Sequence, residues 1–288
     1  MLTLQNEQLM ATISPKGAEL QQLIHRGNGI NYMWGGGAQW PKHSPVLFPI
    51  VGALKQGTYQ FGGNTYHLPR HGFARDAMFV AHQSSATQVV FTLQENAESL
   101  AVYPFQFQLS IGYQLNGATL SCTYGVHNPH SHHTLWFSLG AHPAFAVPLL
   151  AGQSYSDYYL QFNHPEPLLR HKLVDGLIGH QTEEIPAPEG RLSLSPSHFY
   201  EDAVVLKHLK SNHVTLASQH DGHGLHFSFP NFPYFGIWAA KDAPFVCLEP
   251  WCGIADGVNH EQDFTQKEGM EALPPLQHWE RQWQVTCF

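Results

Sequence analysis

Apolar and polar residues alternate along many short stretches of the chain. In Phe105–Tyr113 every second residue is large and apolar, and the residues between them are polar or small. The pair Asn116-Gly117 follows, and this pair is typical of a tight turn between two strands. Alternation resumes over Leu120–Val126. The pattern predicts a β-hairpin in which each strand buries one face.

Strand-like stretches recur through the rest of the chain. They are Val89–Leu93, Leu135–Leu139, Tyr158–Phe162, Val214–Ala217, Leu225–Phe229, Tyr234–Trp238, Phe245–Leu248 and Trp283–Cys287. At the N-terminus, Leu2–Leu4 and Leu9–Ile13 are expected to pair with each other. Helical periodicity is poor, and the best candidate is Asn96–Val102, with Asn96 as its N-cap and Pro104 forcing an end.

Turn residues punctuate the whole chain, which contains 20 prolines and 25 glycines. No linker, composition shift or internal repeat divides it. Many short strands joined by turns predict an all-β protein with few short helices, in which residues 1–288 form one large sandwich or barrel-like domain. Functional side chains in such a fold come from distant stretches and converge on a concave face.

Composition narrows the class of protein. Hydrophobic residues make up 43% of the chain and charged residues 12%, which is enough apolar material for a substantial core. A net charge of −8 with only 14 Lys and Arg argues against a general nucleic-acid binder. The N-terminus lacks the features of a secretion signal, and no segment approaches the roughly 18 apolar residues of a membrane span. We therefore expect a cytoplasmic protein without a membrane partner, whose four scattered cysteines are free thiols.

Two stretches contain a histidine suited to proton transfer. "LPRHGFARD" (residues 68–76) places His71 between two arginines, and "SLGAHPAFAVP" (138–148) places His142 at the expected end of a strand. Pro143 stiffens the chain directly after His142, which suits a side chain that needs a fixed direction. Each histidine alone is also compatible with a packed structural role.

A third stretch, "FVCLEPWCG" (245–253), carries Glu249 at the end of an apolar run. Burial raises the pKa of a carboxyl group and makes it a better base near neutral pH. The alternative is a structural role, with Glu249 capping a loop or pairing with an arginine such as Arg75. Trp251, two residues further on, favours a binding site, because aromatic rings pack on the apolar faces of sugar rings.

Other chemistries are less well supported. His71, His142 and Glu249 are also the ligand types of a His₂Glu zinc site, but no HExxH-like local spacing is present. The chain has no GxSxG, GxxxxGK[ST] or GxGxxG motif. The glycine-rich stretch Gly35–Trp40 lacks the lysine of a nucleotide-binding loop and is expected to be a flexible turn.

Taken together, the motifs resemble the aldose 1-epimerase (galactose mutarotase-like) family, and within it the LacX-type and hexose-6-phosphate mutarotase-like branch. The matching stretches are "PVLFPIVGALKQGTY" (45–59), "LPRHGFAR" (68–75), "YPFQFQLSIGYQL" (103–115), "GVHN" (125–128), "SLGAHPAF" (138–145) and "FVCLEPWCG". Their order and spacing extend nearly end to end. The resemblance implies a β-supersandwich without a metal or organic cofactor.

The resemblance also implies roles for individual residues. Glu249 resembles the general base and His142 the general acid of a proton-shuttling pair. The residues that resemble the family's substrate-binding or site-lining residues are His71, Arg75, Asp202, Trp238 and Trp251. Relatives often carry an arginine where this chain has Ala53, and Lys55 is the candidate substitute, although lysine offers only a point charge.

The expected function is therefore that of an aldose 1-epimerase acting on a hexose or hexose derivative, either free or phosphorylated. In this mechanism Glu249 takes the proton of the C1 hydroxyl, and His142, which starts protonated, gives a proton to the ring oxygen. One alternative is a non-catalytic carbohydrate-binding protein on the same scaffold. A second is a zinc hydrolase, which would contain stoichiometric metal.

Overall fold

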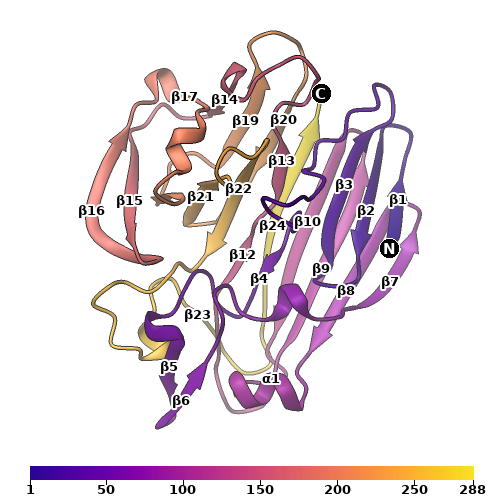
Figure 1. Cartoon of the computed structure of the whole chain (residues 1–288). Helices are drawn as coiled ribbons and strands as arrows, with labels where there is room; N and C mark the ends of the chain where they lie inside the picture. The colour runs from indigo at the N-terminus through magenta and orange to yellow at the C-terminus, as the bar shows by residue number, and fades with distance from the viewer.

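Antiparallel strands form almost all of the regular structure in the computed structural model, which describes residues 1–288 (Figure 1). The largest sheet has nine strands. In spatial order they are β17 (Arg191–Ser193), β14 (Tyr158–Phe162), β19 (His213–Ser218), β20 (Gly224–Ser228), β24 (His278–Cys287), β10 (Thr119–His127), β9 (Gln108–Asn116), β8 (Gln88–Gln94) and β7 (Val80–Ser85).

The second large sheet has eight strands and carries the residues of interest. In spatial order they are β16 (Leu177–Ile185), β15 (Leu168–Val174), β18 (Val204–Lys207), β21 (Tyr234–Trp238), β22 (Phe245–Cys252), β12 (Leu139–Ala141) and β4 (Val46–Leu47), and β13 (Ala144–Ala146) pairs with β22 beside β12. Neighbouring strands of this sheet are distant in sequence, so it collects side chains from across the chain.

Three small sheets complete the β structure. They are β1 (Leu2–Gln5), β2 (Leu9–Ser14) and β3 (Glu19–His25); β5 (Thr58–Phe61) with β6 (Asn64–His67); and β11 (Leu135–Phe137) with β23 (Glu271–Leu273). The N-terminal sheet lies beside β7–β9 in Figure 1. The Tyr113 hydroxyl, which donates to the Ala18 carbonyl at 2.9 Å, holds it there.

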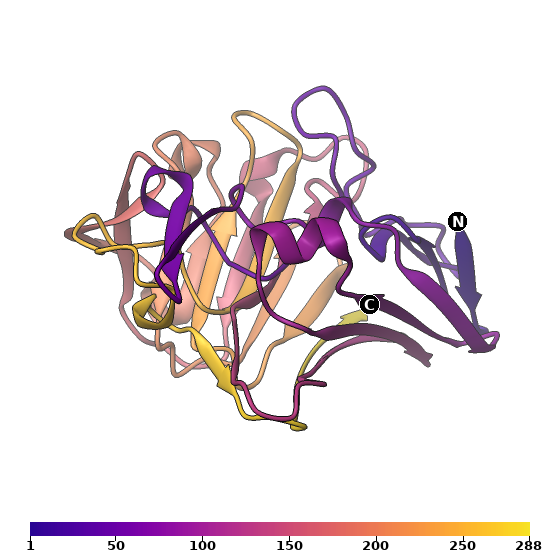
Figure 2. The ribbon, with the colours of Figure 1, turned by 90° about the horizontal axis from the view of Figure 1, so that it is seen from below.

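Helices are few and short. The α-helix α1 (Ala97–Val102) begins at Asn96, whose side chain accepts a hydrogen bond from the Ser99 N–H at 2.8 Å. It lies at the lower end of the molecule, nearest the viewer in Figure 2. The short 3₁₀ turns are Lys55–Gly57, Ala74–Asp76, Tyr155–Asp157, Pro188–Gly190, Pro196–Phe199 and Phe264–Gln266. None of the helices has the length and apolar character that a membrane crossing requires.

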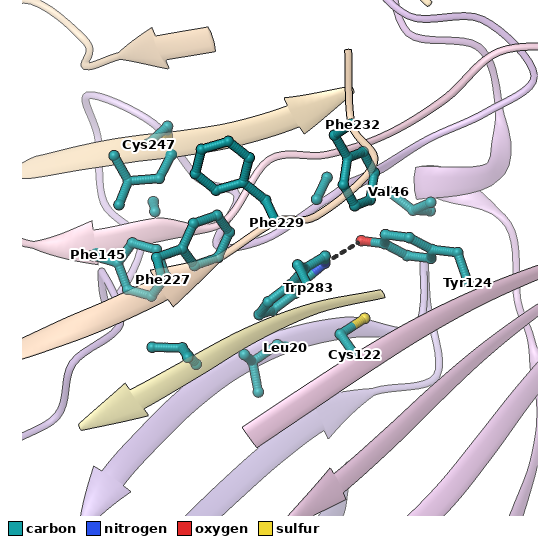
Figure 3. Packing of buried hydrophobic residues seen from close by; sticks show 14 of the residues in the cluster. Leu20, Val46, Cys122, Tyr124, Phe145, Phe227, Phe229, Phe232, Cys247 and Trp283 are labelled. Atoms are coloured by element: carbon teal, nitrogen blue, oxygen red, sulfur yellow. Dashed lines mark hydrogen bonds between the residues drawn. The ribbon is translucent and has the colours of Figure 1, made fainter. Parts of the chain in front are cut away.

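The main core contains 68 buried residues and lies between the two large sheets. Figure 3 shows Trp283 and Tyr124 of the nine-stranded sheet near Phe145 and Val46 of the other, with the Trp283 indole N–H donating to the Tyr124 hydroxyl at 3.1 Å. This layered arrangement is a β-sandwich, as the alternation pattern and the family resemblance predicted.

Both faces of the eight-stranded sheet are covered by buried side chains. Along β22, Val246 and Leu248 belong to the main core cluster, while the alternate residues Glu249 and Trp251 lie on the opposite face of the strand. A second, smaller cluster of eight buried residues, which includes Val205 and Trp251, covers that opposite face. The interior of β22 is therefore buried on both sides, and a polar side chain on it is shielded from water.

Several strand predictions agree with the structure. Tyr158–Phe162 and Tyr234–Trp238 match β14 and β21, the hairpin around Asn116 is β9–β10, and the helix after Asn96 is α1. The predicted strand Leu135–Leu139 is instead two strands, β11 and β12, which belong to different sheets. The predicted strand Phe245–Leu248 continues to Cys252, so Glu249 lies inside a strand and not after its end.

Candidate active site

His142 and Glu249 lie together on the second face of the eight-stranded sheet. The His142 Nε2 is 3.2 Å from the Glu249 Oε2. Only 11% of the His142 side chain and 2% of the Glu249 side chain are exposed. Glu249 does not pair with Arg75, whose Nε lies 3.6 Å from the Asp76 Oδ2. Two residues that are 107 positions apart in sequence thus form one buried pair.

The local backbone explains how a proline follows Glu249 within a central strand. The Leu248 N–H donates to the Pro143 carbonyl at 3.1 Å, at the point where β12 ends and β13 begins. Pro250, two residues further on, directs its nitrogen to the same side, away from β21. Its missing N–H therefore leaves the pairing of β22 with β21 intact. The break between β12 and β13 also contains His142, so it places the histidine beside the glutamate.

A cavity of about 240 Å³ opens over this pair. We call it the central cavity. It is lined by Trp40, Pro45, Val51, Gly52, Arg70, His71, Arg75, His142, Leu173, Gly176, Ile178, Asp202, Ala203, Val205, Trp238, Glu249, Trp251, Ile254 and Ala255. Seven of the eight residues singled out from the sequence lie here. The exception is Lys55, whose amine donates to the His260 carbonyl at 3.1 Å and which does not line the cavity.

Trp251 forms part of the cavity floor because small neighbours leave room for its ring. Trp251 lies opposite Gly140 on β12 and diagonally across from Gly236 on β21. A Cβ atom at Gly140 would lie 2.5 Å from the indole, and one at Gly236 would lie 2.4 Å from it. Both distances are too short for real contacts, so the ring can occupy this position only between two glycines.

His71 enters the cavity from a constrained loop. Its backbone is in the left-handed region with φ 68°, and a Cβ on the following Gly72 would meet the Phe48 carbonyl oxygen at 2.2 Å. The Gly52 N–H donates to the His71 Nδ1 at 3.1 Å. This bond assigns the proton of the neutral ring to Nε2, so His71 can present a hydrogen-bond donor there.

Two tryptophans cover His142. The Trp40 ring stacks on the imidazole with centroids 5.1 Å apart and an interplanar angle of 26°, and Trp238 meets it edge-on at 5.7 Å. Trp40 follows the glycine-rich stretch that the sequence indicated to be a flexible turn. The structure shows that this turn delivers an aromatic ring to the site, which a reading of glycine content alone misses.

Burial shifts both members of the pair toward their neutral forms. Desolvation lowers the pKa of His142 to about 3. Desolvation also raises the pKa of Glu249 well above its usual range, although the nearby Trp251 indole acts in the opposite direction. This environment disfavours the protonated His142 that the sequence analysis expected and favours the shared proton on the Glu249 carboxyl.

The polar rim of the cavity comes from two loops. Arg75 donates to the Arg70 carbonyl at 2.9 Å, and both arginines line the cavity. Asp202 lies on the opposite rim, where its backbone carbonyl accepts a hydrogen bond from Arg170 at 2.9 Å. Arg70 was noted in the sequence only as a neighbour of His71, but it carries an exposed guanidinium at the cavity mouth.

Comparison with known proteins agrees with this architecture. A model of the family described as aldose 1-epimerase matches residues 1–269. The chain belongs to the aldose 1-epimerase family. Membership supports a role in carbohydrate epimerisation at the level of the family, with a sugar as substrate.

Relatives of this aldose 1-epimerase family member cover its whole length. The chromosomal protein LacX of Lactococcus lactis subsp. lactis is 32% identical over 298 residues, which span 100% of this chain and 99% of LacX. A galactose mutarotase related enzyme from Lactobacillus acidophilus has a similar structure, with a TM-score of 0.95, 32% identity and coverage of 100% and 97% of the two chains. A galactose mutarotase-like protein from Lactobacillus casei ATCC 334 also has a similar structure, with a TM-score of 0.93 and 34% identity. The match covers 100% of both chains.

One residue beside the pair was given no role in the sequence analysis. Cys247 is fully buried and lies on the same face of β22 as Glu249. Its Sγ, a ring nitrogen of His142 and a carboxylate oxygen of Glu249 lie within 4.8 Å of one another. Cysteine spacing along the chain does not indicate this group, because it cannot reveal a neighbour, here His142, that a distant segment contributes.

Proposed function

We propose that the protein is an aldose 1-epimerase that interconverts the α and β anomers of a hexose or hexose derivative. The observation that carries the proposal is the buried His142–Glu249 contact on the wall of the central cavity. The interconversion requires removal of a proton from the C1 hydroxyl and delivery of one to the ring oxygen. Those two atoms are attached to the same carbon, so one acid and one base close together suffice.

The pair holds the one proton that the reaction needs. Movement of that proton from the Glu249 carboxyl to the His142 ring, across 3.2 Å, gives a carboxylate base and an imidazolium acid. A bound sugar favours this form because its C1 hydroxyl donates a hydrogen bond to the carboxylate. Each positioned proton transfer contributes roughly 10²- to 10⁴-fold to the rate.

The reaction then proceeds without net consumption of protons. Glu249 accepts the C1 hydroxyl proton, His142 donates to the ring oxygen, and the C1–ring-oxygen bond breaks to give the open-chain aldehyde. Rotation about C1–C2 presents the other face of the carbonyl. The ring oxygen then attacks C1 as it returns its proton to His142, and Glu249 returns a proton to the C1 oxygen.

The rest of the cavity suits one sugar ring. Its volume of about 240 Å³ is below the range of roughly 300–1,000 Å³ typical of drug-sized ligands. Trp251 and Trp238 offer aromatic faces, and Arg75, His71 and Asp202 offer hydrogen-bonding groups for hydroxyls. Alignment by these groups lowers the entropic cost of reaching the reactive geometry.

An anomerisation assay tests the proposal. Freshly dissolved α-glucose and α-galactose, and the corresponding 6-phosphates, are followed by polarimetry with and without the protein. We expect faster approach to the equilibrium rotation for at least one of these sugars, in proportion to protein concentration. Sugar binding without acceleration would instead identify a non-catalytic carbohydrate-binding protein on the same scaffold.

A further inference from the structure

Cys247 lies beside the acid/base pair, and the reaction described above does not use it. It is two residues before Glu249 on β22, so the two side chains share a face of the sheet. The three ligand atoms of His142, Cys247 and Glu249 lie within 4.8 Å of one another, and the chain holds no second group of three His, Cys, Asp or Glu residues this close.

We propose that His142, Cys247 and Glu249 form a reversible binding site for a thiophilic divalent cation of the zinc type, and that the bound cation blocks the acid/base pair. The claim that the cation blocks the pair rests on the proposed function. Binding of the cation to the three residues does not depend on that function, so it can be measured separately.

The geometry suits a tetrahedral ion. Zinc bonds of about 2.0–2.3 Å place neighbouring ligand atoms roughly 3.5 Å apart. The His142 Nε2 and the Glu249 Oε2 are already 3.2 Å apart. The Cys247 sulfur needs to approach by at most on the order of 1 Å. The central cavity lies over the pair and supplies a fourth position for water.

The charges and unsatisfied atoms of the site also favour a dication. The Glu249 Oε1 is buried and has no hydrogen-bond partner, which costs free energy that an ion at this position would recover. A ligating thiolate and carboxylate carry two negative charges, so a divalent ion leaves the buried site neutral. The sulfur ligand favours zinc-like ions over magnesium or calcium, which prefer oxygen.

The surroundings indicate reversible binding and not a resident metal. In permanent sites the second nitrogen of a ligating histidine usually donates to a carboxylate, a carbonyl or water. The His142 Nδ1 has no hydrogen-bond partner. An ion at this site therefore lacks the outer support of a built metal centre and acts as an inhibitor that competes with the sugar.

Cobalt(II) is the probe for the binding half of the proposal, because thiolate ligation produces a sulfur-to-cobalt charge-transfer band in the near ultraviolet. We expect the wild-type protein to show this band and to saturate at one ion per chain, whereas surface histidines bind through nitrogen and do not produce it. Cys247→Ser should remove the band and weaken binding by at least about ten-fold, since even outer-shell changes cost that much.

Cys252→Ser is the matched control, because Cys252 is equally buried on the same strand but lies on its other face and is not part of the group with His142 and Glu249. It should retain the band. Absence of the band from the wild-type protein would overturn the proposal without any variant, and so would unchanged cobalt binding in Cys247→Ser.

Zinc titration of the anomerisation rate tests the blocking half. Zinc should raise the apparent KM for the sugar, and Cys247→Ser should need at least about ten-fold more zinc for the same effect. Zinc that binds at this site without slowing anomerisation would contradict the blocking claim. A wild-type protein that shows the cobalt band but never accelerates anomerisation would count against the proposed function and leave the metal site standing.

Discussion

The proposed mechanism depends on one proton shared by His142 and Glu249. Burial moves the pKa of the histidine down to about 3 and that of the glutamate up, so the pair keeps one proton across a wide range of pH. The titration belongs to the pair and not to either residue alone. A free histidine near its ordinary pKa of about 6.5 would behave differently, because it loses its proton near neutral pH.

The pH dependence of kcat follows from this shared proton. We expect kcat to be flat above the lowered pKa of His142, about 3, and below the raised pKa of Glu249, because the pair neither gains nor loses a proton in that range. It should fall at higher pH, as the raised pKa of Glu249 is passed and the pair loses its only proton. Rates are measured by NMR exchange between anomers after subtraction of the buffer-catalysed reaction. A plateau bounded by the ordinary values, with losses of kcat centred at about pH 4.3 on the acid side and about pH 6.5 on the alkaline side, would show that both residues titrate normally and would contradict the account.

The sequence indicated candidate residues whose side chains can transfer protons. It did not indicate residues that matter only because the fold places them beside those candidates. His142 and Glu249 could be singled out because an isolated histidine and a carboxylate are unusual in apolar runs. Trp40 could not be singled out, since the glycine-rich stretch that it ends does not indicate where its side chain points. Cys247 could not either, because its neighbour His142 comes from a distant part of the chain.

Strands β12, β21 and β22 form the cavity floor, where one large ring, that of Trp251, lies between two glycines. The indole of Trp251 occupies the space that Gly140 and Gly236 leave on the two neighbouring strands. The shape of the floor therefore depends on Gly140 and Gly236, although neither glycine lines the cavity.

Gly236→Ala tests this arrangement. The added methyl group overlaps the indole, so the ring must leave its place. Aromatic stacking is worth about 0.5–1.5 kcal/mol, which predicts a rise in KM of roughly 2- to 10-fold with a smaller change in kcat. Gly112→Ala is the control, because the nearest atom to a Cβ there is 3.8 Å away. Equal kinetic effects of the two variants would show that Trp251 does not shape the sugar site.

The elements that the sequence predicted best are those with one buried and one solvated face. The β9–β10 hairpin has clean alternation and a strong turn signal, and both survive in the structure. Strands β15 and β16 were missed, because β16 has five consecutive exposed residues and most of β15 is only partly buried, so neither shows a clear alternation. The strand β22 was cut short at Glu249, because a charged residue followed by proline is a typical strand ending.

A buried ion pair lies where two segments distant in sequence meet near the cavity. Asp256 accepts hydrogen bonds from the Lys267 amine at 3.0 Å and from the Lys55 N–H at 2.9 Å, and Lys267 also donates to the Ile254 carbonyl. Both side chains of the pair are fully buried. Ile254 lines the cavity, so the pair supports one wall of the site.

Asp256→Ala should destabilise the whole fold, because it leaves the charge of Lys267 buried without a partner. Removal of one member of such a pair costs about 3–5 kcal/mol in the free energy of unfolding, which urea denaturation measures. Asp76→Ala removes an exposed pair with Lys42 and should cost no more than about 1 kcal/mol. A cost for Asp256→Ala as small as that of the control would mean that the pair does not hold this wall in place.

We infer that residues 1–288 form one domain, since a single cluster of 68 core residues reaches from Leu4 to Cys287. We expect urea unfolding followed by tryptophan fluorescence and by circular dichroism to give coincident transitions. Two separate transitions would show that the sheets unfold as independent units.

The most direct test of the whole account is the anomer exchange rate of Glu249→Gln at saturating sugar, with sugar binding measured on the same sample. The amide keeps the size of the side chain but cannot accept and return a proton. We expect exchange to fall by about 10²- to 10⁴-fold while the dissociation constant of the sugar stays within a few-fold of the wild-type value, and the exposed Glu261→Gln to behave as the wild type. Full exchange activity in Glu249→Gln would contradict the assignment of the buried pair as the catalytic acid and base.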